Sequence, residues 1–197
     1  MSKRTLAILI PFLICSLATA TSQQKRFNEG IVRITVLNGT HKNAHEIDYG
    51  YGIIMSKDGE FITSRSLVQE AVRFPNLYTL KVTNKDGSPL SKLKLAKCGL
   101  QPEMDVCLMK VDYSSMYWFK FHPERPDGQK IFSLKNSKNL EHLPVTYTSS
   151  KMNNFVENIL LRVPYDNAVP RGAPLFDKKG MLHGMSITYG RDKVAKD

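Results

Sequence analysis

The chain of 197 residues has few cysteines, a single tryptophan and too few acidic residues to balance its basic ones. It contains no Cys-x-x-Cys or His-Glu-x-x-His spacing, the patterns typical of zinc sites. A glycine-rich phosphate loop is also missing, because Gly50-Tyr51-Gly52 is too short to form one. We therefore expect neither a metal ion nor an organic cofactor.

Long apolar runs are also rare, and the longest stands at the N-terminus. Lys3 and Arg4 precede a mostly apolar stretch, Leu6–Leu17, which is followed by the small residues Ala18–Ala20. This order is typical of a secretory signal peptide with its cleavage site, so residues 1–20 are predicted to be one. The run is short for a membrane span, and we expect no span in the mature chain.

The predicted signal peptide places the protein on the secretory route, either secreted or periplasmic in a bacterium. A mitochondrial presequence is the rival interpretation, because the stretch has no acidic residue. Such presequences are amphipathic, however, whereas this stretch is continuously apolar. An uncleaved anchor is a further alternative.

Positive charge dominates the rest of the chain. The formal net charge of +10 becomes +8 once the two basic residues of the signal are removed. This charge favours acidic surfaces without identifying one. No arginine-rich tract occurs, and strand-borne lysines more often solvate a sheet face or protect its edge. Nucleic-acid binding is therefore not favoured. The lysines in question are Lys92, Lys94, Lys97, Lys130, Lys135 and Lys138.

Two further features depend on the secretory route. Cys98 and Cys107 flank a turn between two expected antiparallel strands and would close a small disulfide loop in an oxidising compartment. The alternative is that they are two small buried apolar residues. Asn38 opens an Asn-Gly-Thr glycosylation sequon, which matters only in a eukaryotic cell.

The local patterns predict an all-β fold, because short strands alternate with polar turns and no long helical period occurs. Turns are expected at Lys57–Gly59 and Asn84–Pro89. Only Ser66–Arg73 suits a helix, with Ser66 as its N-cap. The expected strands are Ile31–Leu37, Tyr51–Met55, Glu60–Thr63, Leu77–Thr83, Ser91–Cys98, Val106–Val111, Tyr117–Phe121, Lys130–Leu134, Pro144–Ser149, Asn158–Val163 and Met181–Thr188.

Three segments resemble HtrA/DegP-type (Do-like) serine proteases. Tyr51–Val68 is similar to the family's strand, Asp-Gly turn and strand before its catalytic histidine, but Ser66 stands at the histidine position. Glu103–Asp112 is similar to the acid segment and keeps the acid, Asp105. The nucleophile box appears as Val-Pro-Arg-Gly-Ala-Pro-Leu, so Arg171 replaces the serine.

The resemblance implies a trypsin-like double β-barrel, with two six-stranded antiparallel barrels and no PDZ domain. The protease-like domain would span residues 21–197, with a first barrel at about 29–114 and a second at about 125–190. The likeness is strongest at Gly52–Val68, Glu103–Asp112 and Gly172–Gly184. It is weakest from Phe119 to Asn167.

The triad implied by the resemblance lacks both its general base and its nucleophile. Ser66 is too weak a base to accept a proton near neutral pH, and Arg171 has no lone pair with which to attack a carbonyl. Val169 and Arg171 stand at the family's oxyanion-hole positions, and Pro170 restricts the loop between them. We expect a non-catalytic conformation for residues 168–172 and an ion pair between Asp105 and Arg171.

A relocated base is not favoured, because none of the histidines lies in a segment that would place it opposite Asp105. These are His41, His45, His122, His142 and His183.

The leading hypothesis is an inactive homologue, or pseudoprotease. It would bind peptide or unfolded-protein segments, or co-assemble with homologous protease subunits, for example as a trimer. The alternatives are a serine-type endopeptidase with a non-standard active site and a chain with no retained function.

Overall fold

The computed structural model describes most of the chain from Phe27 to Ile187. The predicted signal peptide and His41 lie outside the described residues. Within the described part, none of the helices combines the length and apolarity needed to cross a membrane. The described residues are 27, 29–39, 44–98, 105–115, 117–122, 130–134, 140–143, 146–152, 156–162 and 169–187.

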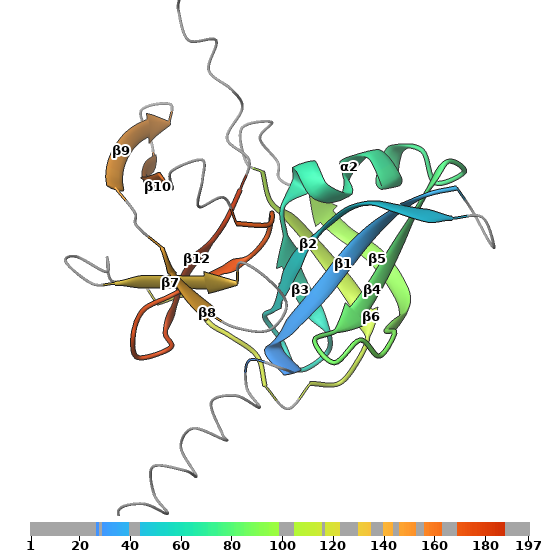
Figure 1. Ribbon diagram of the computed structural model, residues 1–197, viewed down its shortest axis with the longest axis horizontal. Coiled ribbons are helices and arrows are strands. Elements are labelled where there is room, and N and C mark those ends of the chain that lie inside the picture. Colours follow the sequence, from blue (N-terminus) through green and yellow to red (C-terminus); the bar gives the residue numbers. More distant parts are fainter. Residues whose placement is uncertain are drawn as a thin grey trace, which may run out of the picture.

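Six antiparallel strands in the first half of the chain form a nearly closed barrel, shown in blue to yellow-green in Figure 1. Their order is β4-β1-β2-β3-β6-β5. The gap between the outer strands is partly bridged, because Leu90 N–H donates to Val82 O at 2.8 Å. The all-β expectation and its barrel character are confirmed. The strands are β1 (Ile31–Asn38), β2 (His45–Ile54), β3 (Glu60–Thr63), β4 (Tyr78–Asn84), β5 (Ser91–Cys98) and β6 (Cys107–Asp112).

One helix, α2 (Arg65–Arg73), covers an end of the barrel (Figure 1). Its apolar side buries Leu67 and Val68 in the barrel core. The prediction of Ser66 as N-cap is wrong, because the cap is Ser64. The chain leaves β3 in extended conformation for only one residue (Ser64 ψ 129°), so Ser66 already lies in the first helical turn.

The second half of the chain contains two smaller antiparallel sheets. A four-stranded sheet has the order β12-β11-β7-β8, and β9 with β10 forms a separate hairpin. The strands are β7 (Ile131–Leu134), β8 (Leu140–Leu143), β9 (Thr146–Met152), β10 (Val156–Arg162), β11 (Pro174–Phe176) and β12 (Leu182–Met185).

The prediction of a strand at Tyr117–Phe121 is wrong. Its aromatic residues suggested a strand, but the segment crosses between the sheets, where Phe119 N–H donates to Ile54 O at 2.9 Å. Only Phe121 pairs, in an isolated bridge with Leu182. Conversely, β11 was not predicted from the sequence, because three residues are too few to show strand alternation.

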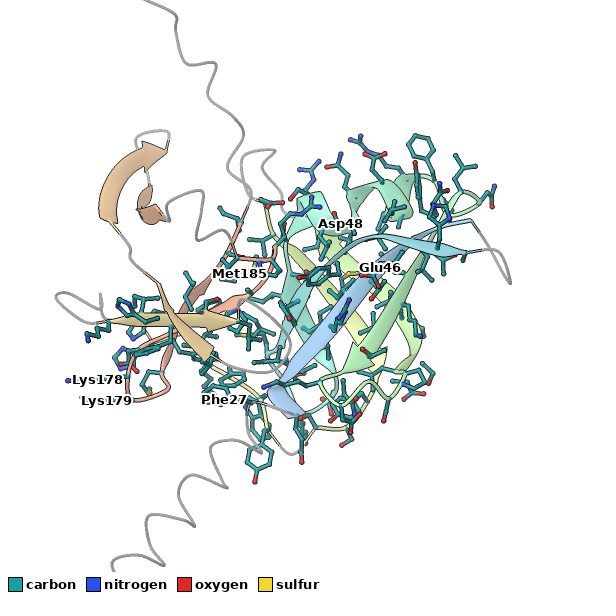
Figure 2. The ribbon with its side chains drawn as sticks, viewed as in Figure 1. Phe27, Glu46, Asp48, Lys178, Lys179 and Met185 are labelled. Atoms are coloured by element: carbon teal, nitrogen blue, oxygen red, sulfur yellow. A yellow bond between two sulfur atoms is a disulfide. The ribbon has the colours of Figure 1, made fainter. Side chains whose placement is uncertain are left out.

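Strands β1 and β2 supply side chains to two cores. Val32 and Ile54 point into the barrel, whereas Ile31 and Ile53 pack between the barrel and the four-stranded sheet. The second core also holds an aromatic group of Phe27, Phe119 and Phe176, with Phe27 at the junction in Figure 2. These strands are therefore covered on both faces, and the two sheets are fixed against each other.

Cys98 and Cys107 are paired across β5 and β6 and joined by a disulfide. Reduction should destabilise the fold by about 2–3 kcal/mol, because the closed loop restricts the unfolded chain. Urea unfolding of residues 21–197, with and without dithiothreitol, measures this difference. The double variant Cys98→Ala/Cys107→Ala is the control, and its stability should not respond to dithiothreitol. Equal stability of the natural protein in both conditions would contradict the prediction.

Candidate functional site

Ser66, Asp105 and Arg171, the residues that the resemblance aligns with a catalytic triad, meet at Ser66. Its backbone N–H donates to Asp105 Oδ1 at 2.5 Å, and its hydroxyl donates to Asp105 Oδ2 at 3.1 Å. From the other side, Arg171 Nη1 donates to Ser66 O at 2.9 Å. Asp105 and Arg171 are 39 and 105 residues away from Ser66 in the sequence. The fold thus brings together all three residues that the sequence singled out.

Asp105 acts here as a cap for the start of α2. Besides its bonds to Ser66, its backbone carbonyl accepts the Arg65 N–H at 3.2 Å, and its Oδ2 accepts the Ser64 hydroxyl at 2.6 Å. The first N–H groups of a helix lack intrahelical partners, and negative charge is favourable beside them. The carboxylate therefore stabilises the helix terminus, a structural role that requires no imidazole.

Arg171 forms its ion pair with Asp48 on β2. Figure 2 places Asp48 at the end of the barrel covered by α2. Burial lowers the pKa of the Arg171 guanidinium below its ordinary value. The ion pair that the structure shows for Arg171 is thus with Asp48, where the sequence led us to expect Asp105. Asp105 is instead held by α2, and nothing in the sequence pattern indicated Asp48.

The turn that carries Arg171 is held against β2. Arg171 O accepts the Tyr51 N–H at 2.9 Å, and Ala173 N–H closes the turn on Pro170 O at 3.2 Å. Gly172 has a φ of 75°, and a side chain there would collide with Tyr51 O. The backbone of β2 therefore sets where the turn lies.

The other side of this turn is fixed by Ser186, just after β12. Gly172 N–H donates to Ser186 O at 2.8 Å, and the Ser186 hydroxyl donates to Pro170 O at 2.5 Å. Val169, which the resemblance aligns with an oxyanion-hole position, is half-buried and packs against the second core. Residue 168 lies outside the described part.

No described histidine contacts Ser64 or Ser66, whose hydroxyl oxygens lie 2.8 Å apart and both lie within hydrogen-bond distance of Asp105. His122 and His183 lie elsewhere, with ring centroids 5.2 Å apart. His183 Nε2 is 3.4 Å from Asp177 Oδ2 beside the β11–β12 turn. A relocated base for Ser66 is therefore not found in the described part of the chain.

The remaining predicted features are placed as follows. Asn38 is exposed at the end of β1, as a glycosylation site requires. His45 is exposed on β2, and His142 lies against Phe132 with ring centroids 5.8 Å apart. Within the described ranges, no cluster of three or more His, Cys, Asp or Glu side chains could hold a metal ion.

Comparison with known proteins adds no family assignment. No protein-family model matches the chain, and no curated protein matches it either. The functional interpretation therefore depends on the residues and contacts described above.

Substitution of Gly172 should be far more costly than substitution of Gly87, which also has a positive φ but has open surroundings. We expect Gly87→Ala to cost about 1–2 kcal/mol for its positive φ. Gly172→Ala should cost at least about 2 kcal/mol more, because the new methyl group must displace the Tyr51 backbone. Urea unfolding of both variants measures this difference. Equal costs would mean that the turn does not pack on β2 as described.

The charge of Asp177 should stabilise the fold at neutral pH. Burial raises the pKa of Asp177, but the N–H groups of Met181 and Lys179 and the His183 side chain outweigh it, so its pKa is lowered from 3.8. A depressed folded-state pKa contributes stability above the ordinary value and loses it as pH falls through the folded value. Asp177→Asn should therefore destabilise at pH 7, and the difference should shrink below about pH 3.8.

Thermal unfolding of the natural protein and Asp177→Asn across this pH range tests the prediction. Asp58→Asn, in an exposed turn, is the control. A difference for Asp177→Asn that is constant with pH would contradict it.

Proposed function

We propose that this chain is a catalytically inactive homologue of HtrA/DegP-type serine proteases, with a trypsin-like double-barrel architecture, and that it works by binding. Its partners would be peptide or unfolded-protein segments, or homologous protease subunits. The observation that carries the proposal is the position of Arg171. An arginine lies against Ser66 where the resemblance would place a serine nucleophile beside a histidine.

The convergence of three separate segments supports the resemblance. A catalytic triad requires its members to lie together although they come from distant parts of the chain. Here Ser66, Asp105 and Arg171 come from the start of α2, the segment before β6 and the turn before β11. The motif comparison used none of these contacts, so the geometry is independent support.

The contacts of the site argue against hydrolysis. Acyl transfer needs a nucleophile and a base that accepts its proton. The guanidinium of Arg171 is held by Ser66 O and Asp48, and the hydroxyls of Ser64 and Ser66 lie beside each other and beside the Asp105 carboxylate. A hydroxyl with only another hydroxyl and a carboxylate as partners lacks the imidazole that activates a serine.

Binding of an extended peptide is supported by the edge of the second sheet. Strand β12 is the terminal strand in the order β12-β11-β7-β8. Its end, at Met185, is followed by Ser186, which holds the Arg171 turn. Phe121 bridges Leu182 at the start of this edge, and His122 N–H donates to Leu182 O at 2.7 Å, so an added strand would pair with the part of β12 that follows Leu182. A peptide paired with this edge would run past Arg171.

Restoration of the triad tests whether the scaffold is that of a protease. We expect residues 21–197 not to cleave casein, and the variant S66H/V169G/P170N/R171S to gain measurable cleavage and labelling by a fluorophosphonate probe. The matched control, S66H/V169G/P170N/R171A, keeps the same backbone changes without a nucleophile and should remain silent. Circular dichroism shows whether each variant is folded.

Binding is measured separately, by fluorescence anisotropy of labelled, unfolded casein peptides with the natural protein. We expect saturable binding. Cleavage by the natural protein that persists through repeated purification would overturn the pseudoprotease proposal. A folded natural protein that binds no peptide would overturn the peptide-binding function.

A further inference from the structure

Three large apolar side chains are exposed close together, at the end of α2 and in its connection to β4. Val72 is 37% exposed, Phe74 is 49% exposed and Leu77 is 57% exposed. Contact of such side chains with water is unfavourable, so a group that covers them is favoured.

Asn38, at the end of β1, lies directly beside this connection. The next residue, Gly39, donates its N–H to Leu77 O at 2.8 Å, and Asn38 pairs with Tyr78 in the register of β1 and β4. The Tyr78 N–H in turn donates to Phe74 O at 3.0 Å. Figure 1 shows the end of β1 beside the connection from α2 to β4.

The Asn38 side chain lies on the face of β1 that α2 covers. Alternate residues of a strand share a face, and Val36, two residues earlier, is buried in the barrel core together with side chains of α2. Directly opposed residues of antiparallel strands also share a face, so the Tyr78 ring lies on the same side. Asn38 is exposed and Tyr78 is half-buried. A group attached to Asn38 therefore begins beside an aromatic ring.

Asn38 also opens the only Asn-x-Ser/Thr sequon in the sequence. At such a sequon a transferase moves an oligosaccharide from a lipid diphosphate to the asparagine. The side-chain amide nitrogen forms a bond to C1 of the first sugar and loses one proton. The bond between C1 and the diphosphate oxygen breaks, and the diphosphate leaves with the electron pair. The step needs neither an oxidant nor a reductant.

We propose that Asn38 is N-glycosylated and that the first sugars of the glycan cover Phe74 and Leu77, with the Tyr78 ring beside the attachment point. N-acetylglucosamine has apolar C–H faces as well as hydroxyls, so it covers apolar side chains and still contacts water. The modification takes place in a eukaryotic secretory compartment, and it therefore depends on the predicted secretory route. The disulfide between Cys98 and Cys107 suits that route.

Expression of residues 1–197 with a C-terminal tag in cultured human cells tests the modification. The secreted protein is compared by intact mass before and after peptide N-glycosidase F, which removes the glycan and converts the asparagine to aspartate. We expect one glycan, located at residue 38 by peptide mass spectrometry. Asn38→Gln and Thr40→Ala should both abolish it, whereas Thr40→Ser keeps the sequon and should retain it. A second version carries residues 21–197 behind an established signal peptide, which separates this result from the signal-peptide prediction.

Fluorescence of the apolar dye bis-ANS tests whether the glycan covers the exposed side chains. The glycosylated protein is compared with the same protein after deglycosylation under native conditions. Dye fluorescence should rise at least about twofold when the glycan is removed, because Phe74 and Leu77 become accessible to the dye. The double variant Phe74→Ser/Leu77→Ser should abolish this rise. Trp118→Ser removes a side chain of similar exposure (39%) from another segment and should leave the rise unchanged.

One glycan at residue 38, with a dye response that requires Phe74 and Leu77, supports the proposal. An unmodified Asn38 in protein secreted behind the established signal peptide overturns it. A glycan whose removal leaves dye binding unchanged overturns the covering role, as does an equal rise in the double variant. Modification only behind the established signal peptide supports the site and contradicts the signal-peptide prediction. None of these outcomes depends on casein cleavage, so the pseudoprotease proposal is tested separately.

Discussion

The structure depends on the burial of β2 on both faces. One face contributes to the barrel core and the other packs on the four-stranded sheet, with Ile54 and Ile53 as neighbours in opposite cores. A strand in this position leaves little space beside it, and a side chain at Gly52 would collide with Phe61 and Val32. Because the backbone of β2 also binds the Arg171 turn, both halves of the candidate site are placed by this one strand.

The pairing of charges at the site follows from this placement. Asp105 approaches the start of α2, where unpaired N–H groups and the helix dipole attract a carboxylate. Arg171 approaches from the opposite side, where it donates a hydrogen bond to Ser66 O and forms an ion pair with Asp48. Asp105 and Arg171 therefore lie on opposite sides of Ser66. Asp105 accepts hydrogen bonds from the start of α2, and Arg171 binds Ser66 O and Asp48. Capping of the helix start gives Asp105 a structural role at this position.

The sequence predicted the features that depend on short spacing. The Asp-Gly turn at Gly59 and the turn at Gly87 are both present, with φ of 78° and 93°. Ser66 and Arg171 were found because short motifs surround them. Asp48 was missed, because its pairing depends on the register of β2 and on a turn more than a hundred residues away. The strand prediction at Tyr117–Phe121 failed for the same reason, since Phe119 packs in a core formed by other strands while Trp118 and Phe121 are exposed.

The energetics of Arg171 show which contacts hold the turn. Its ion pair with Asp48 is about one third exposed on both sides (31% and 36%), and exposed pairs of this kind contribute roughly 0–1 kcal/mol. The backbone contacts of the turn, from Tyr51 and Ser186, are less accessible to water, and Gly172 is buried. The position of the turn is therefore set by its backbone and by Gly172, not by the guanidinium. Replacement of the Arg171 side chain should leave the turn in place, so a serine introduced there would occupy the position defined by β2.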